Sequence, residues 1–250
     1  MADDSTLVKV LFYDIIRQTR RPAGLASVDA DICFDRIAHP IASTTFQAFG
    51  IPTPAIRAML STIQDMRFYL RTGFGNSKNY SGSNKSNPMT TQGMCQGNTA
   101  STVAWTVTSI SMIRAHRQKG HGAHLVAPIS GKSGQLIGRL FLDDNDLFHV
   151  DMRSIAAMKE AQRKFKESVT NCGRLLIATG GALQPSKCSY YMLSFKWNSQ
   201  GQLSYKANHT NNNMSITVLI SNSPPEEIQH LVVNDVVKTL GCMTCPAGDE

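Results

Sequence analysis

The order of helical and strand patterns along the chain predicts an α+β fold. Some segments place apolar residues at helical spacing, others alternate apolar and polar residues, and the two kinds are interspersed. Hydrophobic residues make up 42% of the 250 residues, which is enough for a sizeable core. Because no internal repeat and no convincing linker divides the chain, we expect one mixed domain.

The first half is expected to open with an amphipathic helix over residues 5–20, where Leu7 and Leu11 are part of a helical apolar pattern. A short apolar run at 25–28 predicts a buried strand. Residues 75–91 are rich in Gly, Asn, Ser and Lys, which is typical of a polar loop. The other elements expected here are helices over 35–49 and 54–66 and a strand over 67–74.

The second half is expected to hold two long helices. The first, over 97–119, should turn Val103, Trp105 and Ile110 toward the core. The second, over 153–179, has a basic face that is either solvated or in contact with nucleic acid. We expect a connection over 120–134, strands over 135–142, 147–150, 188–196, 202–206 and 215–220, and a last short helix and strand that end at Gly241.

Composition and charge exclude several classes of protein. No apolar run approaches the roughly 18–20 residues that span a bilayer. The first residues are acidic, whereas a secretory leader begins with basic residues, and six cysteines are too sparse for a disulfide scaffold. We therefore expect an intracellular protein, cytoplasmic or nuclear and not secreted. The net charge of +7 predicts attraction to polyanions, with nucleic acid first.

Two acidic clusters each follow an apolar strand directly. Asp29 and Asp31 come after the first strand, and Asp143, Asp144 and Asp146 come after a later one. Carboxylates at adjacent strand ends can lie close together, and like charges that close require a cation such as Mg²⁺ or Mn²⁺. Two such ions suit an in-line attack on phosphorus, which predicts phosphoryl transfer. The alternative is that these aspartates are ordinary turn and cap residues.

Five segments occur in a distinctive order. They are VDADICFDRI at 28–37, GMCQGNTAS at 93–101, FLDD at 141–144, GGALQPSKC at 180–188 and VKTLG at 237–241. In sequence and order they resemble the palm motifs of reverse transcriptases of the non-LTR retrotransposon kind. The resemblance implies a polymerase palm-type α+β fold, with a mainly antiparallel sheet and flanking helices. It also implies RNA-directed DNA synthesis, with an RNA template, a DNA primer and deoxynucleotides as partners and without a membrane.

The resemblance assigns catalytic roles to residues in three of these segments. Asp29 and Asp143 would bind two Mg²⁺ or Mn²⁺ ions, and Asp144 would support them less directly. The backbone carbonyl of Ala30 would complete the coordination. Lys187 would neutralise or protonate the departing pyrophosphate.

The remaining motif residues would position the substrates. Phe34 would stand against the sugar 2′ position and favour deoxynucleotides, although core packing alone also explains an apolar residue there. Gln96 and Gly97 would line the incoming nucleotide and the template, although they also fit an ordinary helix start. The residues that would hold the primer end are Lys238, Leu240 and Gly241.

The sequence also departs from the family pattern. Few residues precede Asp29 and few follow Gly241, where the family has fingers and thumb regions, which a longer polyprotein would then supply. Leu142 is bulkier than the residue usual in the acidic hairpin, and the usual Ser-Pro pair is missing after Gly97. We expect residual fingers in residues 1–24, the palm in 25–245 and a tail in 246–250.

Other functions remain open at this stage. A catalytically dead palm fragment would only bind nucleic acid, and a cyclase-like palm enzyme would use a free nucleotide without a template. The SGKS sequence at 130–133 resembles the end of a phosphate-binding loop, but that loop requires Gly where Val126 stands, so a hairpin turn is expected. Cys242 and Cys245 lack the second ligand pair of a zinc site.

Overall fold

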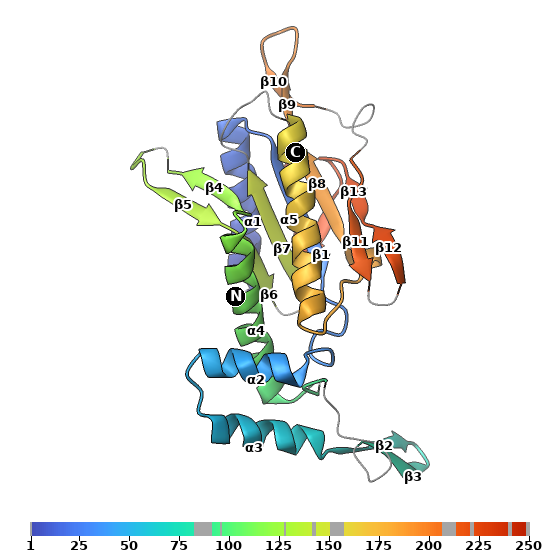
Figure 1. Cartoon of the computed structure of the whole chain (residues 1–250). Helices are drawn as coiled ribbons and strands as arrows, with labels where there is room; N and C mark the ends of the chain where they lie inside the picture. The colour runs from blue at the N-terminus through green and yellow to red at the C-terminus, as the bar shows by residue number, and fades with distance from the viewer. Residues whose placement is uncertain are drawn as a thin grey trace.

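A computed structural model of the chain has a mixed sheet at its centre, with helices on both faces (Figure 1). The strands lie in the order β13 (Gln229–Leu231), β8 (Ser189–Leu193), β1 (Ala23–Asp29), β7 (Asp144–Val150), β4 (Ala123–Val126) and β5 (Ser133–Leu136), and β6 (Gly138–Phe141) also pairs with β7. The structure describes residues 2–82, 92–95, 97–127, 129–141, 144–150, 158–206, 214–220, 223–239 and 242–248.

Most strand pairs in this sheet are antiparallel. Strand β1 runs antiparallel to β7 on one side and to β8 on the other, and β6 forms a hairpin with β7. The parallel pairs are β13 with β8 and a short contact between β4 and β7. The predicted α+β fold with a mainly antiparallel sheet is therefore confirmed.

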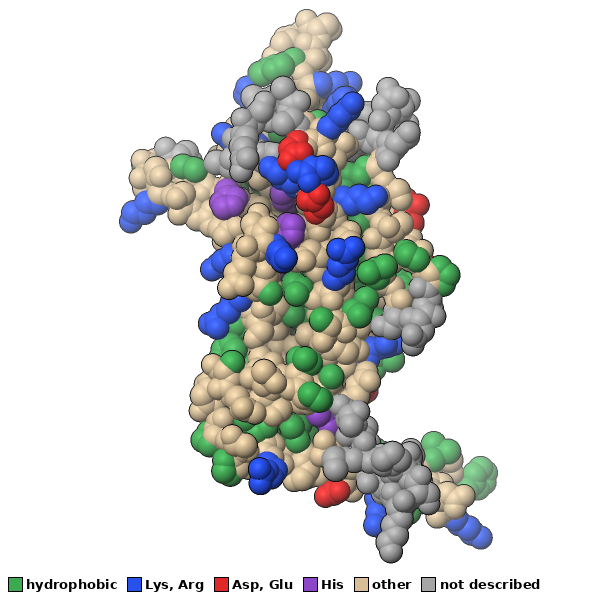
Figure 2. Space-filling view, in the orientation of Figure 1, with side chains coloured by type: hydrophobic (Ala, Val, Ile, Leu, Met, Phe, Trp, Pro, Cys, Tyr) green, Lys and Arg blue, Asp and Glu red, His purple; other side chains and the backbone are tan. Residues whose placement is uncertain are grey.

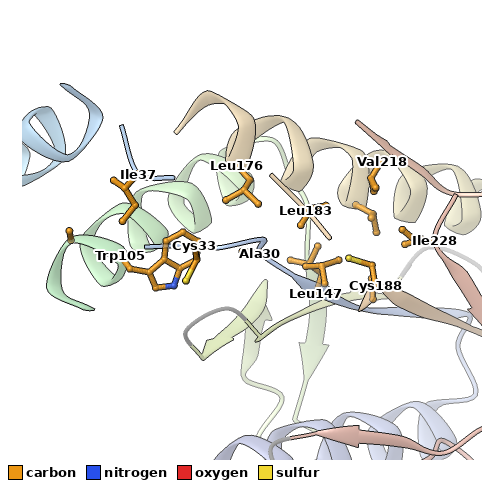
Figure 3. Close-up of a cluster of buried hydrophobic side chains, with 14 of the residues drawn as sticks. Ala30, Cys33, Ile37, Trp105, Leu147, Leu176, Leu183, Cys188, Val218 and Ile228 are labelled. Carbon is orange, nitrogen blue, oxygen red and sulfur yellow. The ribbon is translucent and has the colours of Figure 1, made fainter. Parts of the chain in front are cut away.

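The helices form a layer on each face of the sheet. Helices α4 (Thr99–Gln118) and α5 (Met158–Ala178) cover one face, and α1 (Ala2–Thr19) covers the other. Residues of β1 alternate between the two layers, since Val28 joins the α5 cluster and Leu25 joins the α1 cluster. Figure 3 shows the α5 side of this core, where Leu183 lies between Leu176 and Leu147.

Smaller elements extend from this body. Helices α2 (His39–Ala48) and α3 (Thr53–Gln64) lead to a projecting ribbon of β2 (Arg67–Thr72) and β3 (Gly75–Gly82), as Figure 1 shows. The remaining elements are the 3₁₀ helix η1 (Pro185–Lys187) and three strand pairs: β9 (Phe195–Trp197) with β10 (Leu203–Tyr205), β11 (Thr217–Ile220) with β12 (Ser223–Glu227), and β14 (Val237–Thr239) with β15 (Cys242–Thr244). Within the described residues, no helix is long and apolar enough to cross a bilayer.

Several local expectations were wrong. Residues 75–82 form a strand rather than a loop, because main-chain pairing with β2 outweighs their polar composition. The predicted connection over 120–134 contains β4 and the start of β5, although the turn expected at its tip is present. In place of the expected last helix, the described part of 223–239 holds strands and a turn. Val103 and Ile110 are exposed, because α4 turns a different face, with Ala104, Trp105 and Thr108, toward its neighbours.

Candidate active site

Two of the predicted carboxylates face each other across neighbouring strands. Asp29 is the last residue of β1, Asp144 is the first residue of β7, and the strand register pairs them directly. A cavity of about 80 Å³ lies beside them and is also lined by Lys187 and Val237. Asp143 directly precedes Asp144 in the chain but lies outside the described residues.

The loop that follows Asp29 is fixed by the segment around Gly180. The Asp31 N–H donates to the Ala182 carbonyl at 2.9 Å, and the Gln184 N–H donates to the Asp29 carbonyl at 3.0 Å. Gly180 has a φ of +95°, and a Cβ there would lie 2.4 Å from a backbone oxygen of the same loop. Only glycine therefore allows this close approach, which brings the first and fourth motifs together.

Lys187 and Cys188 contact Asp29 from η1 and the residue after it. The Lys187 Nζ lies 3.5 Å from the Asp29 carboxylate, while 64% of the lysine side chain is exposed. The Asp29 N–H donates to the Cys188 Sγ at 3.4 Å. Burial raises the pKa of the Cys188 thiol to about 11, so this sulfur stays protonated near neutral pH.

The second motif reaches the same loop from the other side. The Met94 N–H donates to the Phe34 carbonyl at 2.9 Å, which places residues 92–95 next to the first motif. Phe34 is half-buried and packs against the core, so the packing explanation accounts for part of its role. Gly97 has a φ of +89°, which favours glycine, and Gln96 lies outside the described residues.

An exposed and strained residue lies between Asp29 and Phe34. Ile32 has a φ of +48°, a backbone conformation that β-branched residues rarely adopt. Its side chain is exposed, so no core contact of the side chain accounts for the strain. Strained backbone of this kind concentrates at functional sites, which makes the loop after β1 a functional candidate in its own right.

Residues 237–241, which we expect to hold the primer end, are described only in part. Ala30 forms an isolated bridge with Leu183, directly beside Asp29. Val237 lines the carboxylate cavity, and Lys238 follows it in β14, although the Lys238 side chain is not described. The other two expected primer contacts, Leu240 and Gly241, lie outside the described residues.

Sequence reasoning missed a buried charge cluster that adjoins the carboxylates. The Lys9 ammonium lies 2.9 Å from the Asp146 carboxylate, and the side chains are only 1% and 5% exposed. The Ser27 hydroxyl donates to the same carboxylate at 2.7 Å, and Arg139 binds its other oxygen at 3.3 Å. One feature of the sequence could have revealed this burial: Lys9 lies on the apolar face of the first helix, together with Phe12.

This cluster lies next to the paired carboxylates of Asp29 and Asp144 in the sheet. Arg139, Asp146 and Ser27 are opposite one another on β6, β7 and β1. The next positions on the same face are Asp144 and Asp29. The Asp146 carboxylate therefore ties three strands and α1 together, directly beside the paired carboxylates.

The donor set suits a hard divalent cation. Asp29 and Asp144 offer carboxylate oxygens at one end of the two central strands, and such oxygens are the ligands of Mg²⁺ and Mn²⁺. In the described parts of the chain, no three His, Cys, Asp or Glu side chains are grouped to hold a metal. Asp143 is the candidate for a third ligand on sequence grounds.

Antiparallel central strands whose ends bring two aspartates together, with helices packed on the sheet, fit a polymerase palm-type domain. The family of reverse transcriptases (RNA-dependent DNA polymerases) matches residues 3–241 of the chain. The protein therefore belongs to the reverse transcriptase family, whose activity is RNA-directed DNA polymerisation, a nucleotidyl transfer. No curated protein matches the chain.

Proposed function

We propose that this chain carries the palm of a retrotransposon reverse transcriptase and adds deoxynucleotides to a primer 3′-hydroxyl on an RNA template. The palm would comprise residues 25–245. The observation that carries the proposal is the direct pairing of Asp29 with Asp144, with the Lys187 ammonium 3.5 Å from Asp29. The order of the five motifs supports a non-LTR element as the source.

Asp29 and Asp143 would hold two Mg²⁺ or Mn²⁺ ions, with Asp144 and the Ala30 carbonyl in support. When bound, such ions activate the primer hydroxyl and offset the charge that develops on the transferred phosphoryl group. Lys187 would neutralise or protonate the pyrophosphate as it leaves, and its exposed ammonium is free to follow that group.

The other residues would select and orient the substrates. Phe34 would exclude a 2′-hydroxyl, and its backbone bond to Met94 would hold it beside Gln96 and Gly97, which line the nucleotide and the template. Lys238 to Gly241 would hold the primer end near the cavity that Val237 lines.

Primer extension on poly(rA)/oligo(dT) with Mg²⁺ or Mn²⁺ tests this function. The wild type should extend the primer, whereas D29N and D143N should abolish extension while keeping the wild-type unfolding midpoint. The matched control is D65N, which removes an exposed carboxylate at the end of α3. Extension that survives D29N would contradict the proposal, and a folded wild type that binds the template–primer without extending it would leave only a binding function.

A further inference from the structure

The β2–β3 ribbon exposes apolar side chains in an unusual way. All six residues of β2 are exposed, and Leu70 alone keeps 71% of its surface in solvent. Phe68 and the tip residue Phe74 are exposed as well. Figure 2 shows hydrophobic and basic side chains together on this projection. A two-stranded ribbon on its own is only marginally stable in water. Exposed apolar patches of this kind mark binding surfaces.

One face of the ribbon combines aromatic rings with cations. Tyr69 is opposite Tyr80, and their ring centroids are 5.8 Å apart. The Arg67 guanidinium lies 4.9 Å from the Tyr80 ring centroid. Arg71 lies two residues further along β2, beyond a register shift that follows Tyr69, and adds a second cation to the ribbon. We call Arg67, Tyr69, Arg71 and Tyr80 the ribbon face.

The charge of the ribbon selects the chemistry of its partner. Residues 67–82 contain Arg67, Arg71 and Lys78 and no Asp or Glu. A face that pairs aromatic rings with cations and has no carboxylates matches a ligand with flat bases and a phosphate backbone. In a duplex the base faces are stacked inside, so the ligand that can use these rings is single-stranded.

The position of the ribbon relates it to the catalytic carboxylates. The chain returns from the ribbon to residues 92–95, which hydrogen-bond the loop after Asp29 through Gly93 and Met94. In Figure 1 the ribbon, α2 and α3 extend beyond the end of the sheet at which β1 stops. The ribbon therefore lies beyond the same end of the sheet as Asp29.

We infer that the ribbon face binds the single-stranded part of the template before it is copied, by stacking its bases on Tyr69 and Tyr80. Arg67 and Arg71 bind the flanking phosphates. This inference rests on the proposed polymerase function, because only a template-directed enzyme has an uncopied strand to guide.

The test is fluorescence anisotropy of a labelled oligo(rA) 12-mer with the full chain, without dNTPs or metal. Y69A/Y80A should weaken binding by about fivefold or more for each ring lost. Y69F/Y80F keeps both rings and should rescue binding. The matched control is W197A on β9, which removes another exposed ring that has an arginine, Arg20, stacked on it at 4.7 Å. W197A should bind as the wild type does.

The outcomes separate this inference from the proposed function. Equal binding by Y69A/Y80A and wild type would overturn the inference even if primer extension is normal. Absence of extension by a wild type that still shows the ring-dependent binding would overturn the polymerase proposal and the template role, and would leave only the single-strand binding by the ribbon face. If sedimentation shows a wild-type dimer that Y69A/Y80A dissociates, with oligonucleotide affinity unchanged, the ribbon is a self-association surface and the inference is wrong. Unfolding midpoints should match, because the ribbon lies outside both core clusters.

Discussion

Asp146 is the residue at which two buried cations and a hydroxyl meet. D146N keeps the shape of the side chain but leaves Lys9 and Arg139 without their shared carboxylate. Breaking a buried ion pair in this way costs about 3–5 kcal/mol. K9M should cost less, because the carboxylate keeps Arg139 and Ser27. Urea unfolding monitored by circular dichroism should show a larger loss of unfolding free energy in D146N than in K9M.

The matched control is E160Q, which removes an exposed carboxylate that pairs with Arg163 on α5. It should leave the unfolding midpoint unchanged. D146N should also slow primer extension at temperatures where it is fully folded, because Asp146 holds the strand positions next to Asp29 and Asp144. A D146N variant as active and as stable as the wild type would show that the cluster has no part in either property.

At the same scale, the sequence predicted some site residues better than others. Asp29 and Asp144 could be predicted because carboxylates at strand ends form a recognisable local pattern. Their exact pairing, and the 3.5 Å approach of Lys187, depend on a register that only the fold supplies. Lys9 could not be paired with Asp146 from sequence, since 137 positions separate them (146 − 9 = 137) and a lysine on a helix is usually solvated.

At the scale of elements, the contact between α4 and α5 contains a buried neutral histidine. The Asn171 amide donates to Nδ1 of His116 at 3.0 Å, so the proton is on Nε2, which donates to the Ser168 hydroxyl at 3.0 Å. Burial, with smaller contributions from the nearby charges of His121 and His149, lowers the pKa of His116 to about 3. The folded protein therefore excludes a proton that the unfolded chain binds below about pH 6.5.

The sign of the pH dependence follows from this difference. Because the folded pKa is depressed, the stabilisation is complete above pH 6.5 and is lost as pH falls toward 3. This residue should reduce the unfolding free energy by about 1.4 kcal/mol per pH unit, or about 2 kcal/mol between pH 7 and pH 5. Urea unfolding at several pH values should show a shallower dependence in H116Q. Equal slopes in the two proteins would refute the assignment.

Helices and strands with several apolar residues were predicted, although the buried face of α4 was not, and strands without an apolar pattern were missed. The first helix, the helix after Gly97 and the strand that ends at Asp29 have bounds close to those expected. Strand β3 was missed because its polar residues contribute little packing, and its pairing with β2 is visible only in three dimensions. Strand β4 was missed because it is four residues long and follows a glycine.

At the scale of the whole molecule, the sheet separates two surfaces with different charges and neighbours. The face of β1 and β7 that carries Asp29 and Asp144 also carries Ser27 and Asp146, which α1 contacts through Lys9. Helix α5 lies on the opposite face. If the nucleic acid binds beside Asp29 and Asp144 as proposed, we expect cations on this face of the sheet, and not those on α5, to lie near it.

The basic face of α5 should consequently be solvated and not in contact with nucleic acid. Within the described part of α5, Glu160 and Glu167 already offset the charge of Arg163.

We expect K166Q/R174Q to leave unchanged the slope of log affinity against log salt for a single-stranded oligonucleotide. R67Q/R71Q on the ribbon should reduce that slope by about 1.4, since each lost phosphate contact on a single strand accounts for about 0.7. Anisotropy titrations between 50 and 200 mM salt, about the range over which such contacts are resolved, give both slopes. A reduced slope for K166Q/R174Q with an unchanged slope for R67Q/R71Q would place the nucleic acid on the α5 side of the sheet instead.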